Sequence, residues 1–179
     1  MHTPPRPRVL LRPPEPADKA ALLQVNQTSI AHHTPWIFPP ITAEQFSAYL
    51  ERCAQADTWS NLVCRREDGA IMGAITLSQI FYGPLQSAYM GYYIGAAYAR
   101  QGYMREAIAL ALDAAFGPLQ LHRIEANIQP GNHASLALVQ RLGFTREGYS
   151  RRYLFIAGAW RDHERYAILT EDWKESPRD

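Results

Sequence analysis

The chain has 179 residues, 47% of them hydrophobic and 20% charged, and these values predict a folded globular protein rather than a disordered one. The 18 basic and 17 acidic residues leave a formal net charge of +1, which argues against nucleic acid as the main ligand, although Arg151 and Arg152 form a local basic pair. Two cysteines are too few for a disulfide or zinc framework, no apolar run is long enough to span a membrane, and the first residues lack the apolar stretch of a signal peptide. We therefore expect a cytoplasmic protein with one domain over residues 8–173 and flexible ends at 1–7 and 174–179.

The first third of the chain predicts one strand and two helices. The strand covers 8–13, the first helix covers 15–27 with Pro16 in its first turn, and the second helix covers 43–56. Between the helices, 28–42 is expected to be irregular, because each of its prolines disfavours helix at the preceding residue.

The middle of the chain predicts three strands and a helix. Strands at 60–66 and 70–80 flank the hairpin turn 67–69, and a third strand covers 88–94. A helix then runs to a stop at Gly117, and its i+4 spacing predicts one buried face made of Met104, Ile108, Leu112 and Phe116.

The last part of the chain adds a strand, a helix and two further strands. The strand covers 122–129, and Asn132 is a good N-cap for a helix over 133–142. Two strand-like runs within 149–169 then flank Ala157 and Gly158. This element order predicts an α/β domain built on one mixed sheet.

The segment YARQGYMREA, residues 98–107, connects the strand at 88–94 to the following helix. A helix N-terminus carries unpaired N–H groups and positive potential, and Gly102 would let an anion approach the backbone closely. Arg100 and Arg105 could neutralise a pyrophosphate. An ordinary helix start with exposed arginines explains the same residues, so the loop alone leaves both interpretations open.

Other nucleotide-binding and catalytic motifs are missing from the sequence. It contains no G-x-G-x-x-G, no G-x-x-x-x-G-K-[ST] and no G-x-S-x-G, which argues against a Rossmann site, a P-loop and an α/β-hydrolase. Its histidines show no metal-ligand spacing, so no metal is expected.

Two longer segments decide between these interpretations: QPGNHASLALVQRLGF and REGYSRRYLFIAGAWRDHERYAIL. Together with the loop they make residues 8–173 resemble the GNAT acetyltransferases, and within them the RimJ/RimL branch, most closely the RimJ type of ribosomal-protein alanine N-acetyltransferase. The resemblance implies a central, mostly antiparallel sheet that splays between its fourth and fifth strands and is flanked by helices. It also implies acetyl-CoA as cosubstrate, and a monomer or homodimer.

The resemblance assigns cofactor contacts to three parts of the chain. The family's phosphate loop, [RQ]-x-x-G-x-[GA], falls on 99–104, where only the glycine matches fully. The family's N-x-x-S pattern falls on Asn132 and Ser135, which could equally be a helix cap and its N3 residue. The expected cofactor-binding residues are Tyr92, Tyr93, Ile94, Ala99, Arg100, Gln101, Gly102, Tyr103, Met104, Arg105, Asn132, Ser135 and Arg141.

The resemblance also implies how the acetyl group is transferred. Strand 90–94 should splay from strand 123–127, and a backbone N–H near Tyr93 or Ile94 should polarise the thioester. Ser135 would protonate the leaving thiolate. Many GNAT enzymes have a glutamate base on the strand that here reads Met-Gly-Tyr-Tyr, and none is present. Glu125 on the neighbouring strand is the candidate base, with an exposed structural glutamate as the alternative.

The acceptor slot is expected beside the proline-rich segment HHTPWIFPP. Trp36 and Phe38 would wall it, with Tyr153 and Asp162 facing it from the last two strands, although core packing and a hairpin cap explain the same residues. The expected acceptor is the N-terminal α-amine of a protein such as a ribosomal protein. A small-molecule amine, such as a drug, polyamine or amino acid, and a non-catalytic acetyl-CoA-binding module are the alternatives.

Overall fold

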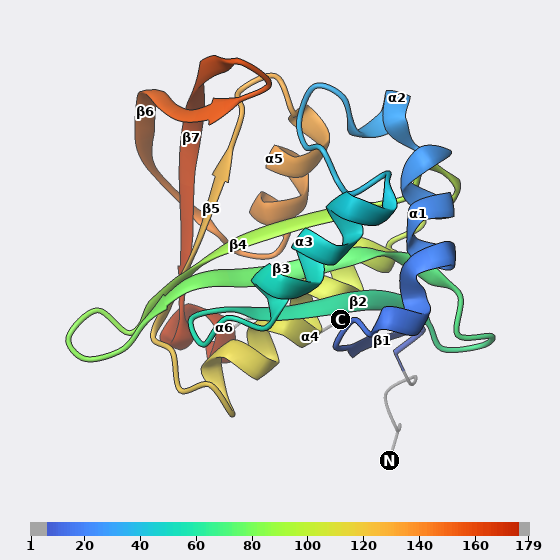
Figure 1. The fold of residues 1–179 in the computed structure, drawn as a ribbon. Coiled ribbons are helices and arrows are strands. Elements are labelled where there is room, and N and C mark those ends of the chain that lie inside the picture. Colours follow the sequence, from blue (N-terminus) through green and yellow to red (C-terminus); the bar gives the residue numbers. More distant parts are fainter. Residues whose placement is uncertain (1–6, 176–179) are drawn as a thin grey trace.

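The computed structural model describes residues 7–175 and is organised around one seven-stranded sheet (Figure 1). The strands are β1 Val9–Arg12, β2 Trp59–Arg65, β3 Ile71–Phe81, β4 Ser87–Ile94, β5 Arg123–Ile128, β6 Thr145–Ile156 and β7 Ala159–Leu169. The α-helices are α1 Lys19–Gln27, α2 Ile30–His33, α3 Ala43–Cys53, α4 Tyr103–Phe116, α5 His133–Arg141 and α6 Thr170–Glu175. Of the ends expected to be flexible, residues 1–6 and 176–179 lie outside the described residues, and 174–175 belong to α6.

The sheet has the strand order β1-β2-β3-β4-β5-β7-β6, and every neighbouring pair is antiparallel except β4 and β5. This parallel pair is joined over only three residues of each strand, Ser87–Tyr89 with Arg123–Glu125. Beyond Tyr89 the two strands separate. The predicted splay between the fourth and fifth strands is therefore confirmed.

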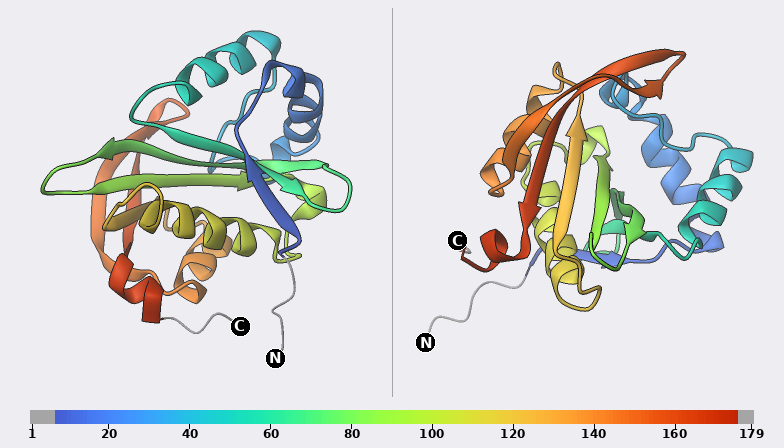
Figure 2. Two further views of the ribbon diagram at one scale, coloured as in Figure 1. Left: turned by 90° about the horizontal axis from the view of Figure 1, so that it is seen from below. Right: turned by 90° about the vertical axis from the view of Figure 1, so that its left-hand side faces the viewer.

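Helices cover both faces of the sheet, so the protein has three layers (Figure 2). α4 and α5 lie on one face, where a large apolar cluster includes the inward side chains of β3 and β5. α1 and α3 lie on the other face over a smaller cluster that contains Leu22, Phe46 and Leu62. Because side chains alternate along a strand, β4 contributes to both clusters, with Met90 on the first side and Tyr93 on the second.

The periodic segments fold as the sequence predicts. The expected apolar face of α4 is buried through Met104, Ile108 and Leu112, while Phe116 is partly buried at its edge. Asn132 caps α5, and a hairpin turn joins β2 to β3. Residue spacing and capping within each segment are enough to predict these elements.

Three elements differ from the prediction. The segment expected to be irregular contains the short helix α2, whose His33 donates Nε2–H to the Ile94 carbonyl oxygen at 2.9 Å. The last residues form α6, where the Trp173 indole donates to Asp113 at 2.9 Å. β6 starts at Thr145, earlier than expected. Contacts with distant residues stabilise α2 and α6, and the local sequence carries no signal for them.

Candidate functional site

The open edge of β4 is the structural centre of the site. Gly95 N–H bonds to the Met72 carbonyl on β3 at 2.7 Å. In an antiparallel pair, alternate residues direct their backbone groups to the same neighbour, so Tyr93 bonds toward β3 while Tyr92 and Ile94 face the gap. Of the two residues expected to polarise a thioester, the backbone of Ile94 faces the gap and that of Tyr93 does not.

The loop before α4 has the backbone of an anion-binding turn. Arg100 and Gly102 have φ values of 62° and 85°, and α4 begins directly after this second left-handed residue. The first hydrogen bond of α4 runs from Glu106 N–H to Gly102 O, so the N–H groups of the three residues before Glu106 lack intrahelical acceptors. A left-handed turn that leads into a helix N-terminus directs several N–H groups at one point.

Arg8, the residue before β1, braces this loop. Its guanidinium pairs with Glu106 at 2.6 Å, donates to the Gln101 carbonyl at 2.9 Å and lies 4.7 Å from the centre of the Tyr103 ring. The loop is thus held in place by a residue more than ninety positions away. No local pattern around Arg8 predicts this role, because its partners are distant in the chain.

The loop side chains differ in what they can offer a ligand. Arg100 and Arg105 are exposed, while Met104 is only 7% exposed and belongs to the core. Ala99 has no polar side-chain atom. Within the expected phosphate loop, Met104 and Ala99 could therefore contribute only backbone, and the positive charge comes from the arginines.

Ser135 and Tyr92 meet across the gap between the sheet and α5. Their hydroxyl oxygens are 2.5 Å apart, and Asn132 accepts a hydrogen bond from Ser135 N–H at 3.2 Å. Burial raises the pKa of Tyr92 to about 12, and the contact with Ser135 opposes the shift. Tyr92 is therefore protonated at neutral pH and can donate a hydrogen bond to Ser135.

Two other expected site residues lie elsewhere. Arg141 is in the last turn of α5, about 13 Å along the helix from Asn132 at 1.5 Å per residue. Glu125 is not the exposed strand glutamate of the alternative interpretation, because its side chain is only 15% exposed and accepts from Arg123 at 3.0 Å, with Arg165 at 3.8 Å. A carboxylate held between two arginines is poorly placed to accept a substrate proton.

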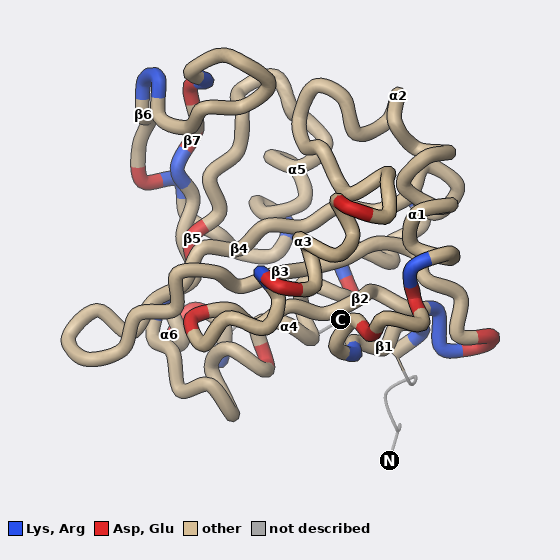
Figure 3. Tube along the Cα trace, in the orientation of Figure 1, with Lys and Arg blue, Asp and Glu red and all other residues tan. Residues whose placement is uncertain are grey.

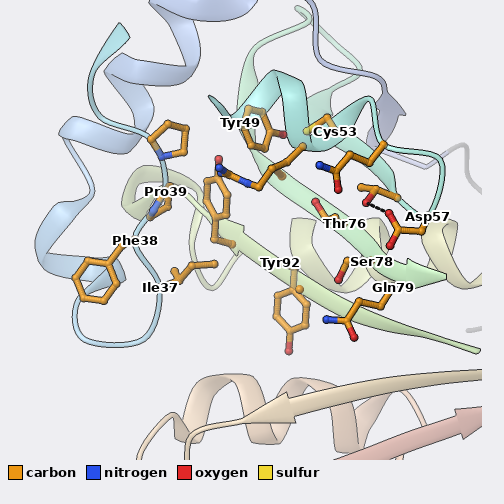
Figure 4. Close-up of a pocket in the computed structure, with 17 residues that line it drawn as sticks. Ile37, Phe38, Pro39, Tyr49, Cys53, Asp57, Thr76, Ser78, Gln79 and Tyr92 are labelled. Carbon is orange, nitrogen blue, oxygen red and sulfur yellow. Dashed lines mark hydrogen bonds between the residues drawn. The ribbon is translucent and has the colours of Figure 1, made fainter. Parts of the chain in front are cut away.

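A cavity of about 410 Å³ opens on the α1 and α3 side of β4 (Figure 4). Its apolar wall is formed by the loop Ile37, Phe38, Pro39 and Pro40, and its other walls come from α3, β3 and β4. Tyr92 lines it as well and points toward α5 in the close-up. The cavity and the Ser135 contact thus share one side chain.

The floor and the inner wall of this first cavity have unusual features. At Gly91 on β4, an added Cβ would meet no atom within 4 Å. The missing side chain therefore leaves open space at the floor of the cavity. Tyr49 and Tyr93 line the inner wall, and their hydroxyl groups have no hydrogen-bond partner among the described residues. Burial raises the pKa of both phenols, so they remain neutral donors.

The charge of the first cavity is balanced. Arg52 and Asp57 are the charged residues among those that line it, and both are exposed. In the close-up, Asp57 lies at the far side from Phe38. The remaining lining is polar but uncharged or apolar.

A second cavity, of about 350 Å³, lies between the same loop and the β6–β7 hairpin. It is lined by Trp36, Gln129, Pro130, Gly131, Tyr149, Arg152, Trp160, Arg161 and Asp162. The four residues expected to form one acceptor slot are therefore divided. Phe38 lines the first cavity, Trp36 and Asp162 line the second, and Tyr153 lines neither because its ring packs edge-on to His163.

Asp162 has a structural role within the second cavity. Its carboxylate accepts from the Tyr149 hydroxyl at 2.6 Å and from Arg152 N–H at 2.7 Å, and these bonds lower its pKa. They hold the irregular part of β6, where the register with β7 shifts and Arg152 has φ 47°. These contacts fit the alternative interpretation of Asp162 as a hairpin cap better than a role in the acceptor slot.

Among residues 7–175, no three His, Cys, Asp or Glu side chains gather into a group that could hold a metal ion. None of the helices in this range has both the length and the apolar character needed to cross a membrane.

Comparison with known proteins gives consistent matches. Residues 8–145 match the family model described as Acetyltransferase (GNAT) domain. The Bacillus subtilis protein named Probable N-acetyltransferase YjcK is 36% identical over 129 residues, which cover 72% of this chain and 71% of that protein. The ribosomal protein uS5-alanine N-acetyltransferase of Escherichia coli is 39% identical over 107 residues, 60% of this chain and 55% of that one. The structure of Mycobacterium smegmatis RimJ in complex with CoA-disulfide has a TM-score of 0.86 and 32% identity, covering 94% of this chain and 85% of that one.

Proposed function

The chain belongs to the GNAT acetyltransferases, which transfer an acetyl group from acetyl-CoA to an amine, and we propose that its acceptor is the N-terminal α-amine of a protein. The likeness to RimJ and to the uS5-alanine enzyme makes a ribosomal protein the first acceptor to test, and the cytoplasm the expected location. The observation that carries the proposal is the first cavity, with its apolar loop wall, open floor and balanced charge.

The charge of the first cavity favours a protein N-terminus over a polyamine. A polyamine has several strongly hydrated ammonium groups, and an enclosed site must offer each of them a carboxylate or another good acceptor. The lining has one aspartate, offset by one arginine. The α-amine of an N-terminal alanine needs only a small pocket and one attack direction, which Gly91 leaves open.

The lack of an obvious base in the first cavity also favours a protein N-terminus as the acceptor. The first cavity has no histidine or glutamate in its lining, and Glu125 is paired with Arg123. An α-amine with a pKa near 7.8 is roughly 15% neutral at pH 7, whereas a lysine near 10.4 is roughly 0.04% neutral. The difference is about 3.5 kcal/mol of deprotonation, so a site that passes the proton to water suits the α-amine.

The remaining groups then have defined tasks in the proposal. The amine nitrogen attacks the thioester carbonyl, whose developing oxyanion is stabilised by a backbone N–H on the open edge of β4, and its surplus proton leaves to water. The C–S bond breaks, and the Ser135 hydroxyl donates its proton to the departing thiolate. Tyr92, 2.5 Å from Ser135, orients this hydroxyl and can pass it a replacement proton.

The test is an acceptor screen with acetyl-CoA at several pH values. The acceptors are a lysine-free peptide that begins with Ala, the same peptide blocked at its N-terminus with one internal Lys, and spermidine. We expect the Ala peptide to be turned over at least about 100-fold faster than the Lys peptide near pH 7, because roughly 15% of its amine is neutral, against roughly 0.04% for lysine. Its kcat/KM should rise about tenfold per pH unit and level off near pH 8.

Two outcomes would contradict the proposal. Preferred turnover of spermidine or of the Lys peptide would replace the acceptor. An inflection of kcat/KM at acidic pH that disappears in Glu125→Gln would identify Glu125 as a general base. It would contradict the proposed transfer of the amine proton to water.

A further inference from the structure

The charged side chains that line the second cavity are two arginines and one aspartate, so positive charge is in excess there. Arg152 on β6 and Arg161 on β7 line it together with Asp162 (Figure 3 shows the basic segments at the upper ends of both strands). Both oxygens of Asp162 are already engaged, by Tyr149 and by the backbone N–H of Arg152. Neither guanidinium group forms a hydrogen bond or ion pair with another described residue. Two planar guanidinium groups in one hollow match a carboxylate in geometry and charge.

Two tryptophans, Trp36 and Trp160, contribute aromatic rings to the second cavity's lining. Trp36 lies against Gly131, where an added Cβ would be 2.9 Å from the edge of the indole. The Trp36 carbonyl accepts from Gln129 at 3.4 Å, and the exposed Trp160 packs edge-on to Phe155 on the hairpin. Two indoles on opposite sides of a slot offer flat contact area to an extended peptide without losing much side-chain entropy.

The second cavity is adjacent to the first along one loop. Trp36 lines the second cavity and Ile37, the next residue, lines the first. An extended peptide advances about 3.3 Å per residue, so an acceptor with its first residue in the first cavity reaches the second a few residues later. The arginines are therefore placed to contact the acceptor downstream of the reacting amine.

We propose that the second cavity binds an acidic side chain of the acceptor protein, within about two to five residues of its N-terminus. This inference rests on the proposed function, since it assumes that a protein N-terminus occupies the first cavity. It adds a sequence preference: Asp or Glu at one of these positions selects among proteins that share the same first residue.

The experiment compares Ala-starting peptides in which Glu, Gln or Lys is placed in turn at positions 2 to 6. In the unmodified enzyme, kcat/KM should favour Glu over Lys about tenfold or more at one or two positions, as expected for a charge-assisted bidentate contact. The preference should shrink as salt is raised, because the arginines are exposed. In Arg161→Glu the ratio should invert in favour of Lys at the same position.

Arg151→Glu is the matched control, because Arg151 lies on the same exposed stretch of β6 but does not line the cavity. The Arg151 charge acts on Asp162 from outside the lining, so Arg151→Glu should change the Glu-to-Lys ratio less than Arg161→Glu and should not invert it. Equal rates on all peptides, or the same ratio in Arg161→Glu, would overturn the inference and leave the N-terminal acceptor in place. No turnover of any Ala peptide would instead reject the proposed function. Inhibition by short RNA that both Arg151→Glu and Arg161→Glu relieve would reassign the arginines to nucleic acid.

Discussion

The two faces of β4 differ in the groups that they offer to a ligand: mostly backbone groups on one face and side chains on the other. On the α4 and α5 side, the groups that point at the gap are mostly backbone: the N–H groups of the loop before α4 and the open edge at Tyr92 and Ile94. On the α1 and α3 side, the first cavity is bounded by side chains from α3, β3 and the loop at 36–40. Backbone groups suit a ligand that is the same in every reaction, whereas side chains can be exchanged to change the acceptor. The cofactor face should therefore tolerate side-chain changes better than the acceptor face, except where a side chain takes part in the chemistry.

In the proposed mechanism Ser135 is that exception, and its loss should have the largest effect. Removing a general acid typically lowers turnover by about 10²-fold or more, so we expect this for kcat in Ser135→Ala. Acetyl-CoA affinity should change little, because Asn132 keeps its cap on α5. Steady-state kinetics and a binding titration give both values. Unchanged kcat would return Ser135 to a purely structural role.

Gly102 tests whether backbone alone holds the pyrophosphate. Its φ of 85° would strain a branched residue such as valine, so Gly102→Asn, which tolerates a left-handed conformation, is the better probe. The new side chain should block the approach to the loop and raise the acetyl-CoA Kd about tenfold, the equivalent of one lost charge-assisted hydrogen bond.

Gly69→Asn is the control for this change. Gly69 has φ 75° and nothing within 4 Å of an added Cβ, so it carries the same backbone penalty in the β2–β3 turn, away from the loop. Its Kd should stay at the unmodified value. If both variants bind acetyl-CoA normally, the loop does not hold the phosphates.

The same contrast explains what the sequence could predict. The faces of α4, the Asn132 cap and the position of the glycine loop depend on residues within one or two turns of each other, and all three are confirmed in the structure. The brace from Arg8, the contact of Tyr92 with Ser135 and the inner wall formed by Tyr49 depend on pairings across the sheet. No local period carries that information. The expected acceptor slot was divided for the same reason, because Trp36 and Phe38 are neighbours in sequence but face different cavities.

Gly91 tests whether the acceptor enters the first cavity. An added Cβ meets no atom within 4 Å, so Gly91→Leu can enter from the strand without a backbone clash and should fill the floor of the cavity. We expect the KM for an Ala peptide to rise about fivefold, corresponding to roughly 1 kcal/mol of crowding, with acetyl-CoA affinity unchanged. Gly148→Leu on β6, where an added Cβ also meets no atom within 4 Å, is the control. A fall in cofactor affinity instead would show that the two faces of β4 are not separate.

His33 connects the two faces, and its titration should give the smallest effect. Its Nε2–H bonds to Ile94 on the open edge, and its carbonyl accepts from Trp36 and Ile37, the residues that line the two cavities. Burial of this side chain, which is 4% exposed, lowers its pKa below 6.5. Well above pH 6.5 the imidazole is neutral in both the folded and unfolded states, so its contribution to stability does not change with pH there.

Below pH 6.5 the unfolded chain takes up a proton that the folded chain resists, so stability should fall with pH, by up to about 1.4 kcal/mol for each unit between the two pKa values. His33→Gln can keep the hydrogen bond without titrating, and should lose less Tm than the unmodified protein between pH 7.5 and pH 5.5. His163 is also buried with a lowered pKa, so His163→Gln should show a similar gain. Only His33 bonds through its carbonyl to Trp36 and Ile37, whereas His163 lies on β7 and bonds to the Arg161 carbonyl. Only His33→Gln should therefore also reduce the rise in peptide KM at pH 5.5, once KM is corrected for the fraction of neutral amine. Equal KM behaviour in the two variants would mean that the loop between the cavities does not depend on the bond from His33 to Ile94.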